Sequence, residues 1–117
     1  MIYNKRIIGN EYEDRAVRYL ENSGYVIVER NFYCKQGEVD IISKDKEYLV
    51  FVEVKYRRDT KKGYPTEAVN YRKKQRIIKA AKYYLYKNGY DNQSVRFDVI
   101  SITGNEIELI KDAFWIE

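Results

Sequence analysis

Two carboxylates and a lysine are spaced so that a β-sheet would bring them to one patch. Side chains alternate between the two faces of a strand, so Glu53 and Lys55 share a face at the end of the apolar run 49–55. Asp40 lies in the preceding apolar run, and a hairpin loop of either 45–48 or 45–46 would place it on the same face as Glu53, directly opposite or diagonal. The sequence therefore predicts that Asp40, Glu53 and Lys55 converge.

This trio has the composition of a phosphodiester-cleaving site. Two carboxylates that face each other across strands repel unless they are neutralised, and a hard cation such as Mg²⁺ or Mn²⁺ binds carboxylate oxygens. We therefore expect Asp40 and Glu53 to be metal ligands, and Lys55 to orient or deprotonate water or to stabilise the phosphoryl charge. The alternative is a surface ion pair of Glu53 with Lys55 and a solvated Asp40, which would make their common spacing incidental.

A fourth carboxylate, Glu13, falls on a helical stripe that should face the sheet. It shares this stripe with Ala16, Val17 and Leu20. A buried carboxylate needs a partner, and we expect a metal-bound water or Lys55 to provide it, which would make Glu13 catalytic. A local ion pair or cap is the alternative.

Composition removes several classes of enzyme. The chain has no histidine and one cysteine, which excludes histidine-based hydrolysis, a Cys/His zinc centre and an internal disulfide. The first residues are too polar for a signal peptide, and no apolar run reaches the length of a membrane helix. We therefore expect a cytoplasmic protein without a membrane association.

Basic residues gather where a polyanion could be bound. The net charge is only +4, but the segment 71–82 holds six basic residues and no acid, and a second basic segment follows Lys55. Such segments are typical of contacts with phosphate backbones, although a solvated helix face remains the alternative. The expected nucleic-acid contacts from these segments are Arg57, Arg58, Lys73, Lys74 and Arg76.

The hydrophobic pattern predicts one α/β domain over residues 1–117. A helix is expected from 9 to about 23, ended by Gly24, and a second is expected from an N-cap at Thr66 to Gly89. The expected strands are 25–32, 38–43, 48–56, 94–103 and 106–111, with Gly37 as a chain break and the apolar tail 113–115 packed on the domain. The order α-β-β-β-α-β-β favours a mixed five-stranded sheet flanked by helices.

Longer motifs in the same order resemble a known family. These are Gly37-Glu38-Val39-Asp40-Ile41-Ile42, Phe51-Val52-Glu53-Val54-Lys55-Tyr56-Arg57 and Arg96-Phe97-Asp98-Val99. Together with flanking positions from Gly9 to Phe114, they resemble the YraN-like family of small uncharacterised proteins. The Asp…Glu-X-Lys core also resembles the signature of the restriction-endonuclease-like superfamily, and the resemblance implies that fold, with kinship to Holliday-junction resolvases and tRNA-splicing endonucleases.

The resemblance implies roles for individual residues. Asp40 and Glu53 would hold the metal, Lys55 would be the catalytic lysine, and Glu13 would complete the site. Lys73 and Gln75 would lie near the substrate. The family often has glycine where this chain has Tyr12, which puts Glu13 in doubt, and Glu38 could equally be a structural acid or a partner of the ligands.

Three functions are weighed on this basis. A metal-dependent endonuclease on DNA or structured nucleic acid leads, because a protein that only binds would not need the Asp-Glu-Lys set. A nucleic-acid-binding module of the same fold is the alternative, and a partner-binding structural protein is the third, since thirteen tyrosines could supply an interface. Cutting both strands of a duplex or a four-way junction would favour a homodimer.

Overall fold

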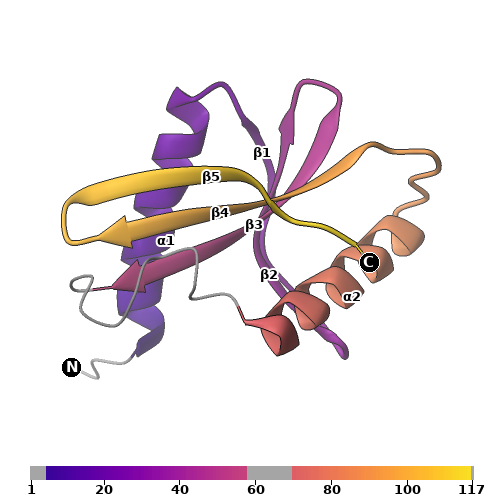
Figure 1. Cartoon of the computed structure of the whole chain (residues 1–117), viewed down its shortest axis with the longest axis horizontal. Helices are drawn as coiled ribbons and strands as arrows, with labels where there is room; N and C mark the ends of the chain where they lie inside the picture. The colour runs from indigo at the N-terminus through magenta and orange to yellow at the C-terminus, as the bar shows by residue number, and fades with distance from the viewer. Residues whose placement is uncertain (1–4, 58–69, 117) are drawn as a thin grey trace.

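A five-stranded sheet lies between two helices in the computed structural model, which describes residues 5–57 and 70–116 (Figure 1). The elements are α1 (Lys5–Asn22), β1 (Val26–Cys34), β2 (Gly37–Asp45), β3 (Tyr48–Arg57), α2 (Tyr71–Lys87), β4 (Val95–Thr103) and β5 (Glu106–Phe114). The predicted element order is confirmed. Neither of these two helices is long and apolar enough to cross a membrane.

The strands lie in the sheet in their chain order, and only one neighbouring pair is parallel. β3 runs parallel to β4, while the pairs β1–β2, β2–β3 and β4–β5 are antiparallel. Parallel neighbours need a crossover connection, and the segment that contains α2 supplies it. The sheet is therefore mixed, as predicted, with β3 at its centre.

Each face of the sheet carries its own apolar core. On one face, Ala16 and Leu20 of α1 join a cluster with Val50 and Val52 of β3, and on the other face Phe51 joins the α2 cluster. Alternate residues of β3 thus serve opposite cores, which explains its uninterrupted apolar run. Glu53 and Lys55 follow Phe51 at steps of two, so the alternation sends them toward the α2 face.

The ends of several elements differ from the predictions, α1 for example beginning at Lys5 and not at residue 9. Gly24 ends α1 with φ +94°, as expected, but α2 begins at Tyr71 with Asn70 as its N-cap, and the predicted cap Thr66 lies outside the described residues. The Asn70 side chain accepts a hydrogen bond from the Lys73 backbone N–H at 2.9 Å, which satisfies a first-turn donor. Gly37 starts β2 instead of breaking the chain. A Cβ on it would lie 2.6 Å from the Arg76 carbonyl oxygen, so only glycine allows this approach of β2 to α2.

The C-terminal tail is part of the sheet. β5 continues to Phe114, which is buried against Phe97, whereas the following Trp115 is 66% exposed. The pattern predicted a strand that stopped at Lys111. The β4–β5 register shifts between Phe97 and Val99, so β5 carries a bulge that masked the alternation.

A buried polar network ties β4 to its surroundings. Asp98, which is fully buried, accepts hydrogen bonds from the Tyr25 hydroxyl at 2.7 Å and from Arg96 Nε at 2.9 Å. Arg96 also donates to Asp45 at 2.8 Å, and the Asp112 N–H donates to Asp98 at 2.9 Å. Burial and the bond to Asp98 raise the pKa of the Tyr25 phenol, which keeps it a donor. The Arg96-Phe97-Asp98 motif is therefore structural.

Removing the Asp98 carboxylate should destabilise the domain strongly. Asp98→Ala leaves Arg96 and Tyr25 without their shared acceptor, and breaking a buried ion pair in this way costs about 3–5 kcal/mol. Urea unfolding followed by circular dichroism measures the loss, with Asp91→Ala, at an exposed position before β4, as the matched control. A loss below about 1 kcal/mol, the value of an exposed pair, would contradict this account of the motif.

Candidate metal and nucleic-acid site

Glu53 is buried where β3 leaves the core, and its partner comes from α2. The side chain is 3% exposed, and its Oε1 atom lies 2.7 Å from Lys73 Nζ and 3.6 Å from Lys55 Nζ. Lys55 follows on the same face of β3, as the alternation predicted. A buried carboxylate is stable only with such partners, so Lys73 also fixes the first turn of α2 on the sheet.

Asp40 approaches Glu53 from β2, where the β2–β3 ladder ends. The pairs run from Asp45–Tyr48 to Ile41–Val52, a register that, continued by one step, sets Asp40 directly opposite Glu53. This is the register predicted from a hairpin loop of 45–48, in which the two carboxylates are directly opposite. Beyond the last pair of this ladder, Asp40 Oδ2 accepts a hydrogen bond from the Val54 N–H at 2.9 Å, which ties Asp40 to β3.

The proximity of the two carboxylates changes the titration of Asp40. Burial and the negative charge of Glu53 raise the pKa of Asp40 to about 8, against the opposing effects of the Val54 N–H and Lys73. At neutral pH Asp40 therefore favours its protonated form over a second full negative charge beside Glu53. A divalent cation would relieve the same repulsion without the proton.

The two lysines respond to this environment in opposite directions. Burial, together with the neighbouring Lys73 ammonium, lowers the pKa of Lys55. Burial alone would also lower the pKa of Lys73, but the Glu53 carboxylate outweighs it and the pKa is raised. Lys73 is thus held as a positive charge, while Lys55 is the lysine that gives up its proton more readily.

The donor set suits a cation that keeps most of its own water. In residues 5–57 and 70–116, no three carboxylate or cysteine side chains gather closely enough to hold a metal. Asp40 and Glu53 offer carboxylate oxygens, and Mg²⁺ is commonly held by one or two carboxylates plus waters and substrate phosphates. The residues fit such an ion, provided that Lys73 shares or yields the Glu53 oxygen that it contacts.

Glu13 has a different partner from the one predicted. Its Oε1 atom accepts from Arg30 Nε at 3.1 Å, and the same guanidinium binds Asp14 at 2.6 Å. Of the two partners expected for Glu13, Lys55 is not the one that the structure shows, because the ion pair of Glu13 is with Arg30 of β1. Arg30 pairs in the sheet with Ile41, the residue after Asp40, so one guanidinium links Glu13 and Asp14 of α1 to the strand that lies beside β2.

Tyr12, the residue in place of the family's frequent glycine, packs flat on Tyr56. Their ring centroids are 3.7 Å apart, and the Arg15 guanidinium lies 5.9 Å from the Tyr12 ring. This stack joins α1 to the exposed end of β3. It gives Tyr12 a packing role in the helix turn that carries Glu13.

The predicted nucleic-acid contacts are divided among several places. Lys73 belongs to the carboxylate cluster, Lys74 lies 5.9 Å from the Phe114 ring centroid, and Gln75 lines a cavity next to it. Arg57 ends β3 on the strand that carries Lys55. Arg58 lies outside the described residues.

A cavity of about 220 Å³ opens beside the cluster, and Lys73 lines both. Arg76 is exposed at its wall, and Glu38 is its single acid among the described residues. The complete lining consists of Glu38, Asn70, Arg72, Lys73, Arg76 and Ile77. Two arginines line this hollow together with Lys73, and such a set of cations could hold a phosphate.

The sequence contained a signal for Lys73 that the charge pattern concealed. Lys73, Ile77, Ala80 and Tyr84 recur at intervals of three and four residues, and the last three are buried. A lysine on the buried stripe of a helix needs a buried anion. The charge pattern placed Lys73 with the other basic residues of 71–82 and gave no indication of its ion pair with Glu53.

The raised pKa of Asp40 predicts a specific pH dependence of stability. An aspartate that titrates near 3.9 when unfolded and near 8 when folded binds more protons in the folded state between these values. Its contribution is fully present below about pH 4 and is lost as the pH rises through 8. In chelator-treated samples, the unfolding free energy of the wild type relative to Asp40→Asn should fall across this window.

The matched control for this measurement is Asp91→Asn, at an exposed position before β4. Its difference from the wild type should stay level over the same pH range in urea unfolding. A level difference for Asp40→Asn as well would contradict the charged pair as described.

Comparison with known proteins places this site in a family. The profile of a family described as "Uncharacterised protein family UPF0102" matches residues 12–102, which span the cluster from Glu13 to Lys73. A UPF0102 protein of Persephonella marina is 50% identical over 108 residues, covering 92% of this chain and 93% of that protein. A UPF0102 protein of Fusobacterium nucleatum is 46% identical over 112 residues, covering 96% and 94%.

A UPF0102 protein of Clostridium botulinum strain 657 is 47% identical over 123 aligned positions, covering 99% of this chain and all of that protein. These matches run through every described element that builds the site. They confirm the resemblance drawn from the motifs, and the chain belongs to the UPF0102, or YraN-like, family.

Proposed function

We propose that this protein is a metal-dependent endonuclease that hydrolyses phosphodiester bonds in DNA or structured nucleic acid. The observation that carries the proposal is the meeting of Asp40 and Glu53 from adjacent strands with Lys55 and Lys73 beside them. A buried carboxylate pair with one raised pKa is costly. Such a site is expected where it binds a cation, and perturbed carboxylates in general mark functional positions.

Each residue of the site would have its own role in hydrolysis. Asp40 and Glu53 would hold Mg²⁺ or Mn²⁺, which supplies a more acidic water and polarises the phosphate. Lys55, whose pKa is lowered, would orient the attacking water or accept its proton. Lys73 would balance charge at Glu53 and then at the phosphate, and Arg76 on the cavity wall would hold the adjoining backbone.

The order of these residues supports membership in the restriction-endonuclease-like superfamily. Asp40 stands on β2, and Glu53 and Lys55 stand two residues apart on β3, at the centre of a mixed sheet covered by a helix on each face. This is the arrangement that the Asp…Glu-X-Lys resemblance implied. Kinship to Holliday-junction resolvases, a homodimer that cuts two strands and a cytoplasmic location follow as parts of the same proposal.

One observation favours a second candidate, a nucleic-acid-binding module with little activity. Lys73 already lies 2.7 Å from Glu53, so the carboxylate is paired without a metal. In that case the cluster would serve to fix α2 on the sheet, and Arg72 and Arg76 of the adjoining cavity would bind phosphate. The two candidates differ in whether a divalent cation and the two carboxylates matter for turnover.

Cleavage of labelled nucleic acids tests the proposal. The panel holds single-stranded DNA, duplex, flap, four-way junction and tRNA, each with Mg²⁺, Mn²⁺ or a chelator. The wild type should cut at least one form only with metal, and Glu53→Ala and Lys55→Ala should lower the rate at least about 100-fold, the scale for losing a transition-state contact.

The control variant is Lys79→Ala, an exposed lysine of α2, which should cut at the wild-type rate. Circular dichroism establishes that all variants fold. Salt-sensitive binding by the wild type without cleavage in any metal would overturn the endonuclease in favour of the binding module. Cleavage that survives both substitutions would show that another site is responsible.

A further inference from the structure

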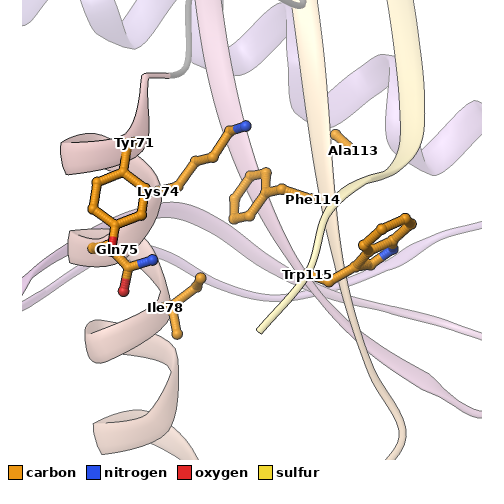
Figure 2. A pocket seen from close by; sticks show the side chains of 7 residues that line it. All are labelled: Tyr71, Lys74, Gln75, Ile78, Ala113, Phe114 and Trp115. Carbon is orange, nitrogen blue, oxygen red and sulfur yellow. The ribbon is translucent and has the colours of Figure 1, made fainter. Parts of the chain in front are cut away.

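A separate cavity of about 260 Å³ lies between α2 and the end of β5 (Figure 2). Tyr71, Gln75 and Ile78 form its α2 side, and the Phe114 ring faces them, while Trp115 lines the cavity at its edge with the indole turned away from α2. Lys74 reaches over toward Phe114, with Nζ 5.9 Å from the ring centroid. None of the described residues that line the cavity is acidic.

Two of the largest exposed apolar surfaces of the described chain frame this cavity. Tyr71 is 73% exposed and Trp115 is 66% exposed, although each would gain by burying its ring. Phe114 between them is 7% exposed and provides an apolar floor. The site thus has aromatic walls, one amide and one ammonium group.

The fold holds Trp115 in place through the buried network of β4. Asp112 has φ +55°, its N–H donates to Asp98 at 2.9 Å, and its carboxylate accepts the Trp115 indole N–H at 2.8 Å. A non-glycine residue in the left-handed region is uncommon and needs such support. Asp98 therefore supports the bulge before Phe114 and, through Asp112, holds the indole at the edge of the cavity.

We propose that this cavity binds one unpaired base of the nucleic-acid strand that the protein acts on, an inference that rests on the proposed function. Unstacked bases are recognised by stacking on aromatic rings and by hydrogen bonds to their edges. Tyr71 and Phe114 offer rings within the cavity, the Trp115 indole lies at its edge, and the Gln75 amide offers both a donor and an acceptor. The volume lies below the roughly 300–1,000 Å³ of pockets for drug-sized ligands, which suits a single base.

The charge of the surroundings identifies the occupant as part of a polyanion. No acid occurs in α2, whereas Arg72, Lys73, Lys74, Arg76, Lys79, Lys82 and Lys87 are basic. An unpaired base on a phosphate backbone matches both the rings and this charge. An apolar peptide, or a second copy of this basic chain, would leave these basic groups without an anionic partner.

The cavity lies next to the carboxylate cluster on the same helix. Tyr71, Lys74, Gln75 and Ile78 make one helical stripe, and Lys73 with Ile77 makes the adjacent one. A helix is about 10 Å across with its side chains, so one short strand can reach both places. A base seated here would direct cleavage to strands with an unpaired nucleotide near the scissile bond.

Trp115 is the only tryptophan of the chain, so its fluorescence reports on the cavity directly. The wild-type protein is titrated with a short single-stranded oligonucleotide, an abasic strand of equal length and a mononucleotide. Anisotropy of labelled strands measures affinity in parallel. Stacking on the indole should quench its emission with the base-containing strand, but not with the abasic strand or the mononucleotide at the same concentration.

Substitutions of the walls provide the second readout. Tyr71→Ala and Trp115→Ala should weaken single-strand binding about tenfold, within the range for losing one stacked base, with an unchanged salt slope because phosphate contacts remain. Trp115→Phe should keep most of the affinity. Tyr86→Ala, which removes an 83% exposed tyrosine of the same helix away from the cavity, is the control and should bind as the wild type does.

The other outcomes separate this inference from the proposed function. Cleavage and tight binding with unchanged emission and unaffected wall variants would overturn the base pocket and leave the endonuclease standing. Quenching by the mononucleotide as strong as by the strand would overturn the strand as occupant in favour of a free nucleotide. Failure of the wild type to bind any nucleic acid would contradict both.

Discussion

A carboxylate buried at the end of the central strand sets the conditions for the rest of this structure. β3 can carry Glu53 at 3% exposure only if a cation meets it there. Lys73 supplies that charge from the first turn of α2, and its 2.7 Å contact determines where the helix rests on the sheet. The Asn70 cap and Gly37, with room for no side chain next to Arg76, bring α2 close enough to make the contact.

The buried charge of Glu53 also contributes to the raised pKa of Asp40. The strand position of Asp40 opposes Glu53, and its carboxylate accepts a hydrogen bond from the Val54 N–H. The two acids meet where the pairing of β2 with β3 ends, which gives the patch its chemical character. A second buried acid, Asp98, has full hydrogen-bond satisfaction and a structural role, so burial alone does not distinguish a reactive carboxylate. What distinguishes Asp40 is the second carboxylate beside it, since burial and the charge of Glu53 raise its pKa.

The sequence predicted what depends on periodicity and missed what depends on contacts between distant elements. Strand alternation correctly put Glu53 and Lys55 on one face and limited Asp40 to two registers, because side-chain direction follows a period of two. The partner of Glu13 could not be read in this way, since Arg30 reaches it only through the packing of α1 on β1. The bulge at Asp112 hid the last residues of β5, and with them the cavity beside Trp115.

The central claim is that Asp40 and Glu53 together form a divalent-cation site, and Mn²⁺ titration of the chelator-treated protein by calorimetry tests it most directly. The account predicts a saturable site that is lost in Asp40→Ala and kept in Asp91→Ala, which removes an exposed carboxylate outside the cluster. Binding that is absent from the folded wild type, or that is unchanged in Asp40→Ala, would contradict it.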